Sequence, residues 1–586
     1  MTSPADQSAL TTQNPVAGGG EGPAPLSRLL ADLRDQIDAL RFTLDVPGAE
    51  EARLAAKEIR DQLDDYVLPR VRAAATPLLA VFGGSTGAGK STLVNSLVGA
   101  RVSGTGVLRP TTSSPILVCH PDNFDWFMGT EDTPPGVVPT MGRVEGPAPD
   151  AVVGDQLVVI RTEAVPRGVA LLDSPDFDSL FEDHYEFATK LMAAADLWIC
   201  VTTAARYADA QVWRMLQRAR EQGASLGVVL SRVQPGPGRE VAEHFAEMLD
   251  ERGFGEAPRF TIPETTVVES RLPEDDISDI RAWLTGFVDN TEVRDEVIVE
   301  TLGGVLDSFR VRIPALARQV EDQVDRRDDL ARIVESAYST ALAELDEATR
   351  NGALLQGEVL ARWQDFAGTG DLLRALHVRR GKDVPKPSTR RRRSAPRVRA
   401  LKAALRSALE SLIVAAAEQG AEQAVARWQG DPAGVLVLAD KAAVLGTASP
   451  ELSRRVTRAV SGWQDHVLEL VRHEGVIKRS IAKLVSFDSE ALSVVLMVGI
   501  LGYGTSDVVV EGGTSAVPQR LLKSLFGAES LRGMSAKAKA DLRARVTMLL
   551  DEESLRFGQV LDQADIPDEG TAVALYQATY NLEVAR

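Results

Sequence analysis

Cysteine is almost absent from this 586-residue chain, which has only Cys119 and Cys200. Both lie within short apolar runs, so we expect two buried free thiols, a reducing compartment and no disulfide framework. Long hydrophobic runs are also missing. No stretch reaches the ~18–20 apolar residues that a membrane-spanning helix needs, and the N-terminus has no basic patch followed by an apolar core, so we expect no export signal. These absences favour a cytoplasmic protein.

Basic residues are outnumbered: the chain has 65 Lys and Arg against 83 Asp and Glu, a net charge of −18. A chain this acidic is a poor general binder of nucleic acid. The exception is the segment 379–406, which contains twelve basic residues and only one acid, Asp383. Its prolines, Pro385, Pro387 and Pro396, predict a flexible basic loop between two helices. Such a loop suits anionic lipid at the inner face of the cell membrane; a solvated loop and a contact with nucleic acid or a ribosome are the alternatives.

One glycine-rich stretch organises the rest of the chain. Residues 84–91 fit the pattern G-x-x-x-x-G-K-[ST], with an apolar run at 78–82 before it and a helical pattern at 90–99 after it. Glycines let consecutive backbone N–H groups converge on phosphate oxygens, and the N-terminus of the following helix adds positive potential. Lys90 is expected to reach the β- and γ-phosphates, and Ser91 to bind Mg²⁺. The residues predicted to hold a nucleoside triphosphate here are Gly84, Ser85, Thr86, Gly87, Ala88, Gly89, Lys90, Ser91 and Thr92.

Apolar runs and helical stretches alternate from residue 77 to 290, which predicts an α/β domain: a mostly parallel sheet with helices on both faces. The expected strands are 78–82, 115–119, 156–161, 168–173, 196–202, 226–232 and 258–268. The expected helices are 90–99, 183–195, 208–222, 239–252 and 275–289. We interpret the Pro- and Gly-rich stretch 120–155 as an insertion between strands.

Outside this domain the patterns are helical or of low complexity. Residues 1–25 are rich in Gly, Pro, Ser, Thr and Gln and are expected to be disordered. Residues 26–76 predict neck helices split at Pro47-Gly48. Residues 291–586 predict a long all-α stalk or trunk. Its expected interruptions are Gly368-Thr369-Gly370, 385–396, Gly430-Asp431-Pro432, Ser449-Pro450 and Gly512-Gly513, and its expected core tryptophans are Trp363, Trp428 and Trp463.

The most apolar stretch of the trunk is 491–504, bounded by Glu490 and Asp507. The stretch 491–504 is too short for a helix that spans a bilayer, so we favour a core helix. The stretch is apolar all round and contains three glycines, which keeps open a second interpretation, a tip that contacts the membrane.

Candidate magnesium ligands follow the glycine turn along the chain. Asp173 ends the apolar strand 168–172, where it is placed to hold Mg²⁺ through water; the plainer interpretation is an aspartate that caps the next turn. Thr111 or Thr112 is placed to bind Mg²⁺ and to sense the γ-phosphate, with a plain turn as the alternative. The predicted catalytic residues are Lys90, Thr111, Thr112 and Asp173, and the predicted Mg²⁺ ligands are Ser91, Thr111, Thr112 and Asp173.

Residues 89–99, Gly-Lys-Ser-Thr-Leu-Val-Asn-Ser-Leu-Val-Gly, resemble the first helix of translation-factor-type GTPases and especially of bacterial dynamin-like proteins. The order of flanking helices, nucleotide domain and long helical body also resembles dynamins. The resemblance implies Mg²⁺-dependent hydrolysis of GTP, homo- or hetero-dimers that pair through their GTPase domains, and work on membranes.

The chain departs from the family pattern beside the γ-phosphate. The D-x-x-G motif reads Asp173 to Asp176, so a carboxylate stands where the family has glycine. This change favours an alternative function, a regulatory switch or scaffold that binds nucleotide and hydrolyses it little. Thr86 and Gly87 occupy the positions where eukaryotic dynamins carry Gln and Ser, so the resemblance assigns no residue to orient the attacking water.

The base-reading motif departs as well. The family's N/T-K-x-D aligns with residues 231–234, which supply Ser231, Arg232 and Gln234 as candidate base contacts. An aspartate accepts from both guanine N–H groups, whereas Gln234 offers one carbonyl, so guanine preference should be weaker. An ATP-using P-loop enzyme is therefore the third candidate. Ser270 is expected in the last base-contacting loop.

Overall fold

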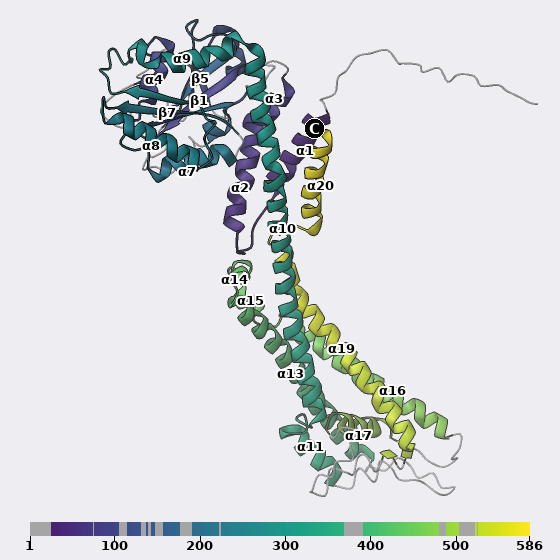
Figure 1. Ribbon diagram of the computed structural model, residues 1–586. Coiled ribbons are helices and arrows are strands. Elements are labelled where there is room, and N and C mark those ends of the chain that lie inside the picture. Colours follow the sequence, from purple (N-terminus) through teal and green to yellow (C-terminus); the bar gives the residue numbers. More distant parts are fainter. Residues whose placement is uncertain are drawn as a thin grey trace, which may run out of the picture. The chain divides into compact units, whose positions relative to one another are not determined.

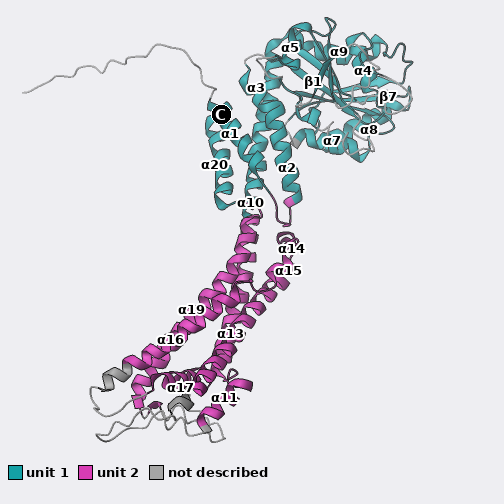
Figure 2. Ribbon diagram, turned by 180° about the vertical axis from the view of Figure 1, so that it is seen from behind, with its two compact units in different colours: residues 1–41, 50–321, 568–586 teal, residues 42–49, 322–567 magenta. Residues whose placement is uncertain are grey.

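The computed structural model describes residues 25–73, 76–104, 114–130, 136–138, 142–146, 156–175, 190–221, 224–368, 391–479, 488–502, 522–523 and 525–586. The chain divides into two compact units, coloured separately in Figure 2. Unit 1 comprises residues 1–41, 50–321 and 568–586, and unit 2 comprises residues 42–49 and 322–567. Unit 1 contains an α/β domain with helices from both ends of the chain, and unit 2 is all-α.

The α/β domain contains an eight-stranded sheet in the order β3-β4-β2-β5-β1-β6-β7-β8. The neighbouring strands are parallel except for β2 and β5, which pair antiparallel. The strands are β1 (Leu78–Gly84), β2 (Ile116–Cys119), β3 (Arg143–Glu145), β4 (Leu157–Arg161), β5 (Val169–Asp173), β6 (Leu197–Thr203), β7 (Ser225–Val233) and β8 (Arg259–Pro263). The strand β1, which carries the glycine turn, therefore lies inside the sheet between β5 and β6.

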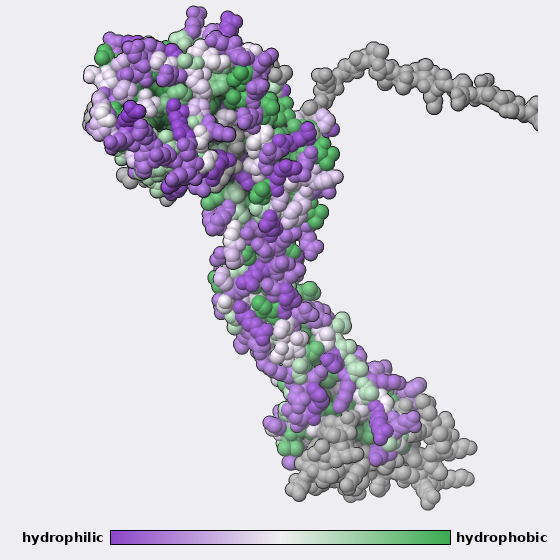
Figure 3. All heavy atoms as spheres, in the orientation of Figure 1, coloured by the Kyte–Doolittle hydropathy of each residue, from purple (hydrophilic) through white to green (hydrophobic). Residues whose placement is uncertain are grey.

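Helices cover both faces of this sheet (Figure 1). On one face α4 (Lys90–Val98) and α9 (Glu274–Asp289) pack on alternate residues of the strands, such as Leu78, Ala80 and Phe82. On the other, α7 (Ala210–Glu221) contacts β6 and α8 (Gly238–Glu251) contacts β7. Every residue of β1, β5 and β6 is buried, as expected of strands with helices on both sides. The visible face of the domain is mostly hydrophilic, with scattered apolar residues (Figure 3).

The insertion at 120–155 is only partly described, and it contains more order than a loop. A 3-10 turn (Pro121–Asn123), α5 (Phe124–Met128) and the short edge strand β3 lie within it. Three residues are too few for periodicity to reveal a strand. Of the expected helix 183–195, residues 190–193 are helical in the described part.

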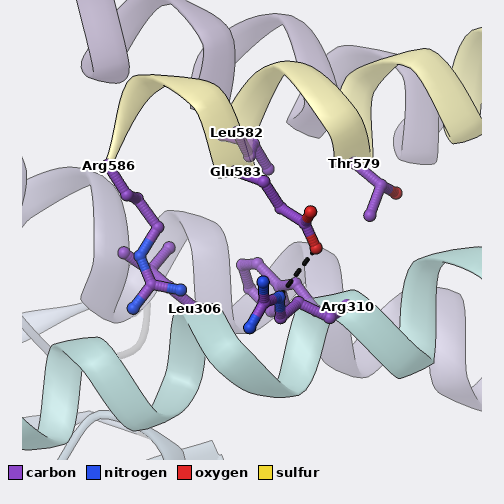
Figure 4. Close-up of a pocket in the computed structure, with 7 residues that line it drawn as sticks. Leu306, Arg310, Thr579, Leu582, Glu583 and Arg586 are labelled. Atoms are coloured by element: carbon purple, nitrogen blue, oxygen red, sulfur yellow. Dashed lines mark hydrogen bonds and ion pairs between the residues drawn. The ribbon is translucent and has the colours of Figure 1, made fainter.

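Neck helices from both ends of the chain belong to unit 1. They are α1 (Pro25–Ala39), α2 (Ala49–Gln62), a π-helical turn (Leu63–Val67), α3 (Leu68–Arg72), the first part of α10 (Thr291–Arg350) and α20 (Glu569–Ala585). The helices α1 and α20 pack together. Figure 4 shows α20 beside α10, where the Glu583 carboxylate accepts from Arg310 Nε at 2.7 Å and apolar residues such as Leu306 and Leu582 lie alongside.

A buried polar hub joins these helices to the sheet. Asp196, which lies just before β6 and is fully buried, forms an ion pair with Arg70. The Asp196 Oδ1 accepts from the Tyr66 hydroxyl at 3.0 Å, and the Oδ2, which pairs with Arg70, also accepts from the Leu79 N–H of β1 at 2.7 Å. Thr301 of α10 donates to the Asp196 carbonyl at 3.0 Å. Burial raises the pKa of Asp196, and Arg70 opposes that rise.

Unit 2 is a helical body. Besides the remainder of α10 it contains α11 (Gly357–Gly368), α13 (Arg391–Gln429), α14 (Pro432–Leu438), α15 (Ala442–Leu445), α16 (Leu452–Arg479), α17 (Ser489–Gly502) and α19 (Ala528–Asp562). Trp363, Trp428 and Trp463 are almost fully buried, which confirms them as core residues. The indole N–H groups of the last two donate to backbone carbonyls at 3.0 and 2.8 Å, so burial leaves neither donor unpaired.

The apolar stretch 491–502 forms α17, and residues 503–504 lie outside the described part. Ten of its residues are buried, against α13, α16 and α19. Gly502 allows a close approach, because an added Cβ would lie 1.8 Å from a Leu355 methyl carbon. In this structure the stretch is a core helix of unit 2. In the described part of the chain, no helix has both the length and the apolarity to cross a membrane.

The basic segment 379–406 differs from the expected loop in its second half. Residues 391–406 belong to α13, with Pro396 inside the helix, and residues 379–390 lie outside the described part. Pro396 is the sixth residue of α13, so its missing N–H removes one backbone hydrogen bond just after the first turn. Three of its described basic residues lie near acids of unit 2: Arg397 with Asp365 at 3.3 Å, Lys402 with Asp465 at 3.6 Å, and Arg406 with Glu410 at 3.6 Å.

Candidate nucleotide-binding site

The turn between β1 and α4 has the backbone that a phosphate cradle requires. Gly84, Gly87 and Gly89 have φ values of 155°, 74° and 96°, where L side chains are strained. At Gly84 an added Cβ would also lie 2.0 Å from the Val201 carbonyl oxygen of β6. Only glycine therefore lets β1 turn at this point.

Lys90 is the first residue of α4, and its side chain folds back over the turn. It is buried, and its Nζ donates to the carbonyls of Gly84 at 3.0 Å and Ser85 at 3.3 Å. The ammonium is thus held at the centre of the turn, close to the helix N-terminus. Ser85 is buried as well, and its Oγ has no hydrogen-bond partner among the described residues. A buried donor of this kind in a glycine turn suits a phosphate oxygen.

Asp173 lies beside this turn because β5 pairs directly with β1. It is fully buried at the C-terminal end of β5, opposite Phe82, and α4 contacts the same strand. The Ser103 hydroxyl donates to its Oδ2 at 2.5 Å. The next residue, Ser174, donates to the Phe82 carbonyl at 2.8 Å and ties the end of β5 to β1.

Sequence reasoning missed Ser103 and the residue that positions it, Asn95. Asn95 is a fully buried residue of α4; its Oδ1 accepts from the N–H groups of Val102 and Ser103 at 2.9 and 2.8 Å, and its Nδ2 donates to the Ser103 carbonyl at 2.9 Å. The available signal was a lone asparagine on the apolar face of a short helix, where an unpaired amide would be costly.

The oxygen atoms of Ser91 and Asp173 are of the kind that binds a magnesium ion. Ser91 and Asp173 offer a hydroxyl and a carboxylate, the hard oxygen ligands that Mg²⁺ prefers, and the triphosphate would supply others. Thr111, Thr112 and Asp176 lie outside the described residues. Among the residues that are described, no group of three or more His, Cys, Asp or Glu could hold a metal by itself.

A pocket of about 260 Å³ adjoins the turn on its β7 and β8 side. It is lined by Ala88, Gly89, Thr92, Leu93, Val201, Ser231, Arg232, Ile262, Pro263, Glu264, Thr265, Val267 and Leu272. The Ser231 hydroxyl donates to the Ala88 carbonyl at 2.8 Å and lies within 3.0 Å of the Thr202 carbonyl, so the loop after β7 is tied to the phosphate turn. Arg232 adopts a left-handed backbone with φ 56°.

Two predicted base contacts do not line this pocket. The side chain of Gln234 is exposed and does not line the pocket. The backbone carbonyl of Gln234 accepts from the Gly238 N–H at 3.0 Å in the turn before α8. Ser270 has φ 63° within the turn closed by the Val268–Arg271 bridge. The expected strand 258–268 is too long: β8 ends at Pro263, so Glu264 and Thr265 form the loop that reaches the pocket.

The glycine turn after a buried strand, the lysine at the helix start and the acidic end of the adjacent strand define a P-loop nucleotide-binding domain. In the part of the chain that the structure describes, unit 1 contains this α/β domain and unit 2 is all-α. No protein-family model and no curated protein matches the sequence.

Several solved structures show a distant likeness. A chain from an oligomerised bacterial dynamin pair, described as sensing and tethering membranes over long range, is 11% identical, with 96% of this chain and 94% of that chain covered and a TM-score of 0.42. A second chain from such a pair is 10% identical over 67% of this chain and 75% of that one, with a TM-score of 0.29. Era in complex with MgGDPNP and 16S ribosomal RNA is 16% identical over 32% of this chain and 52% of that one, with a TM-score of 0.22. At these scores the fold assignment depends on the strand order and the turn geometry of the chain itself.

Proposed function

We propose that this protein is a dynamin-like GTPase, which hydrolyses GTP to GDP and phosphate with Mg²⁺ and couples hydrolysis to movement of its helical body. The observation that carries the proposal is the phosphate turn, in which three glycines at positive φ surround the buried ammonium of Lys90. Backbone N–H groups and a fixed cation in such a turn recognise the β- and γ-phosphates of a nucleotide.

Each part of the site has a distinct role in this proposal. Backbone N–H groups of residues 85–91 and the Lys90 ammonium hold the phosphates, while Ser91, Asp173 and Thr111 or Thr112 would hold Mg²⁺. When bound, Mg²⁺ would neutralise negative charge on the phosphates. Hydrolysis proceeds by attack of water on the γ-phosphate without a covalent intermediate. Asp173 is held by Ser103, so the segment that leads toward Thr111 is linked to the end of β5.

Substitution of Lys90 by alanine tests the site. Loss of a charge-assisted phosphate contact costs about 1.5–3 kcal/mol, so we expect GTP affinity to fall at least about tenfold and turnover to collapse, with helicity unchanged by circular dichroism. The matched control is Lys190→Ala, which removes a half-buried lysine paired with Asp61 at 3.2 Å in the same unit. Unchanged turnover in Lys90→Ala contradicts the proposed site.

Asp176 favours a second candidate function, a nucleotide-operated switch or scaffold with little hydrolysis. A carboxylate at the family's glycine position repels the γ-phosphate unless it points away. Single-turnover hydrolysis of bound GTP separates the two, because a switch retains GTP over many minutes. The absence of an aspartate from the motif at 231–234 favours the third candidate, an ATP-using enzyme, which competition between ATP and GTP for the site decides.

Membrane binding is proposed on the charge of the segment 379–406. About 1 kcal/mol is gained per basic residue near an anionic surface, so replacing Arg390–Arg393 by serine should release the protein from anionic vesicles. The control exchanges Arg397, Lys402 and Arg406, whose charges already lie near acids, and should have a smaller effect. Turnover with and without the same vesicles shows whether lipid stimulates hydrolysis. Equal vesicle binding by all variants excludes the lipid role and leaves the two alternatives, a solvated loop and a contact with nucleic acid or a ribosome.

Pairing through the GTPase domains, as homo- or hetero-dimers, is the last part of the proposal and comes from the dynamin resemblance alone. Sedimentation analysis with GDP and with a non-hydrolysable GTP analogue tests the homodimer. We expect a shift to dimers only with the triphosphate analogue. A monomer under both conditions contradicts homodimer formation.

A further inference from the structure

The pocket beside the phosphate turn contains one acid. Of the thirteen described residues that line it, Glu264 is the sole carboxylate and Arg232 the sole cation, and the others are apolar or hydroxyl-bearing. The side chain expected to read the base, Gln234, is exposed and does not line the pocket.

The backbone of Glu264 is fixed at the end of the sheet. Its N–H donates to the Val233 carbonyl at 2.9 Å, directly after Pro263 pairs with Val233 in the β7–β8 ladder. The side chain is exposed at the pocket, so a base entering it would meet a hydrated carboxylate on a rigid support. Val267, 48% exposed and part of the same lining, offers an apolar surface on which a flat base can pack.

The phosphate turn contributes to the same pocket. Ala88 and Gly89 line it, and Ser231 ties the loop after β7 to the Ala88 carbonyl. A nucleotide whose phosphates occupy the turn would therefore place its sugar and base in the pocket that Glu264 lines. The volume, about 260 Å³, lies just below the ~300–1,000 Å³ typical of whole-ligand pockets, which suits the base end of a nucleotide.

We propose that Glu264 supplies the carboxylate that reads guanine, in place of the aspartate that the motif at 231–234 lacks; this inference rests on the proposed nucleotide-binding function. A carboxylate presents acceptors only, and guanine offers two donors on one edge, N1–H and the 2-amino group. Adenine offers the 6-amino donor beside the N1 acceptor, so one carboxylate oxygen would face an acceptor. Hypoxanthine retains N1–H and lacks the 2-amino group.

Substitution of Glu264 by glutamine gives the sharpest test. The glutamine amide accepts a hydrogen bond through its oxygen and donates one through its nitrogen. Xanthine offers the matching pair, an N1–H donor and a C2 carbonyl acceptor, whereas guanine offers two donors. Affinities for GTP, ITP, XTP and ATP are measured by competition against a fluorescent GTP analogue. We expect the wild type to bind GTP about tenfold or more tightly than ITP, and Glu264→Gln to lose a similar factor for GTP while gaining affinity for XTP.

Gln234→Ala is the matched control, because it alters the neighbouring loop and should retain GTP preference. Unchanged GTP and XTP affinities in Glu264→Gln overturn the inference, as does equal binding of GTP and ITP by the wild type, a measurement that requires no variant. A wild type that binds none of the four triphosphates contradicts the proposed function itself. If the wild type prefers GTP and Gln234→Ala is the variant that loses this preference, base reading belongs to Gln234.

Discussion

Replacing Arg70 by methionine removes the cation of an ion pair that is almost completely buried, with side-chain exposures of 1% for Arg70 and 0% for Asp196. Removing one partner of such a pair leaves a buried charge uncompensated and costs about 3–5 kcal/mol. The Tyr66 hydroxyl and the Leu79 N–H still donate to Asp196, so we expect the lower end of this range. A loss of about 3 kcal/mol raises the population of the opened α/β domain by a little over 100-fold.

The two cysteines make this opening measurable in one unit of the chain. Cys119 in β2 and Cys200 in β6 are buried in the sheet of unit 1, and burial raises the pKa of each to about 12. They react with a thiol reagent only when the sheet opens, so the labelling rate reports the opening free energy when closing is fast. We expect Arg70→Met to label a little over 100-fold faster than the wild type.

The matched control is Arg34→Met in the same unit. The Arg34–Asp64 pair has side-chain exposures of 35% and 30%, and pairs this exposed contribute about 1 kcal/mol or less, so labelling should change less than about fivefold. Adding Asp196→Asn to Arg70→Met removes the uncompensated charge and should recover part of the loss. Labelling of Arg70→Met within threefold of the wild type would refute the reasoning.

The pH dependence of the same variant has a definite sign. Arg70 lowers the pKa of Asp196 against the effect of burial. Without Arg70 the folded variant binds a proton on Asp196 at higher pH than the folded wild type does. The stability deficit of Arg70→Met should therefore shrink as pH falls and grow as pH rises, when each rate is compared with the wild type at the same pH.

Three further outcomes are expected. Gly84→Ala places a Cβ 2.0 Å from a β6 carbonyl oxygen and should lower the free energy of unfolding of unit 1, measured in urea, by about 3 kcal/mol. The control Gly286→Ala has open space around the new methyl group and should change this free energy by less than about 1 kcal/mol. Ser103→Ala removes a donor to the buried Asp173 carboxylate and should raise the Mg²⁺ concentration needed for GTP binding about tenfold; no change contradicts the placement of the metal. Neither cysteine of the folded protein should react with a maleimide at pH 8, because only about 10⁻⁴ of a thiol with a pKa of about 12 is ionised at that pH. Both cysteines should react in urea.

Most of the strands were predictable because their signals are local. The predicted strands 78–82, 168–173 and 196–202 contain uninterrupted apolar runs at 78–82, 169–172 and 197–201, and each run lies in a fully buried strand of the sheet. Glycines that carry positive φ marked the turn after the first of them. The break at Gly430-Asp431-Pro432 was predicted for the same reason: Asp431 caps α14, whose first residue is the proline.

The parts that escaped prediction depend on contacts distant in sequence. The role of Asp196 follows from helices more than 100 residues away on both sides, which no local pattern records. The end of β8 was misplaced because Val267 and Val268 look strand-like, yet they lie in a loop and are exposed. Glu264 was missed for a related reason: its importance appears only when β8 ends beside the phosphate turn.

The strand β1 has a different kind of contact at each end. Leu79, near its start, donates to the carboxylate that also holds the neck residues Tyr66 and Arg70, and Gly84, at its end, begins the turn around Lys90. The five residue steps from Leu79 to Gly84 span only about 17 Å, and buried, paired strands stretch little. A displacement of the turn along the strand axis when a phosphate is gained or lost would therefore reach the neck helices through a single rigid segment, without passing through any loop.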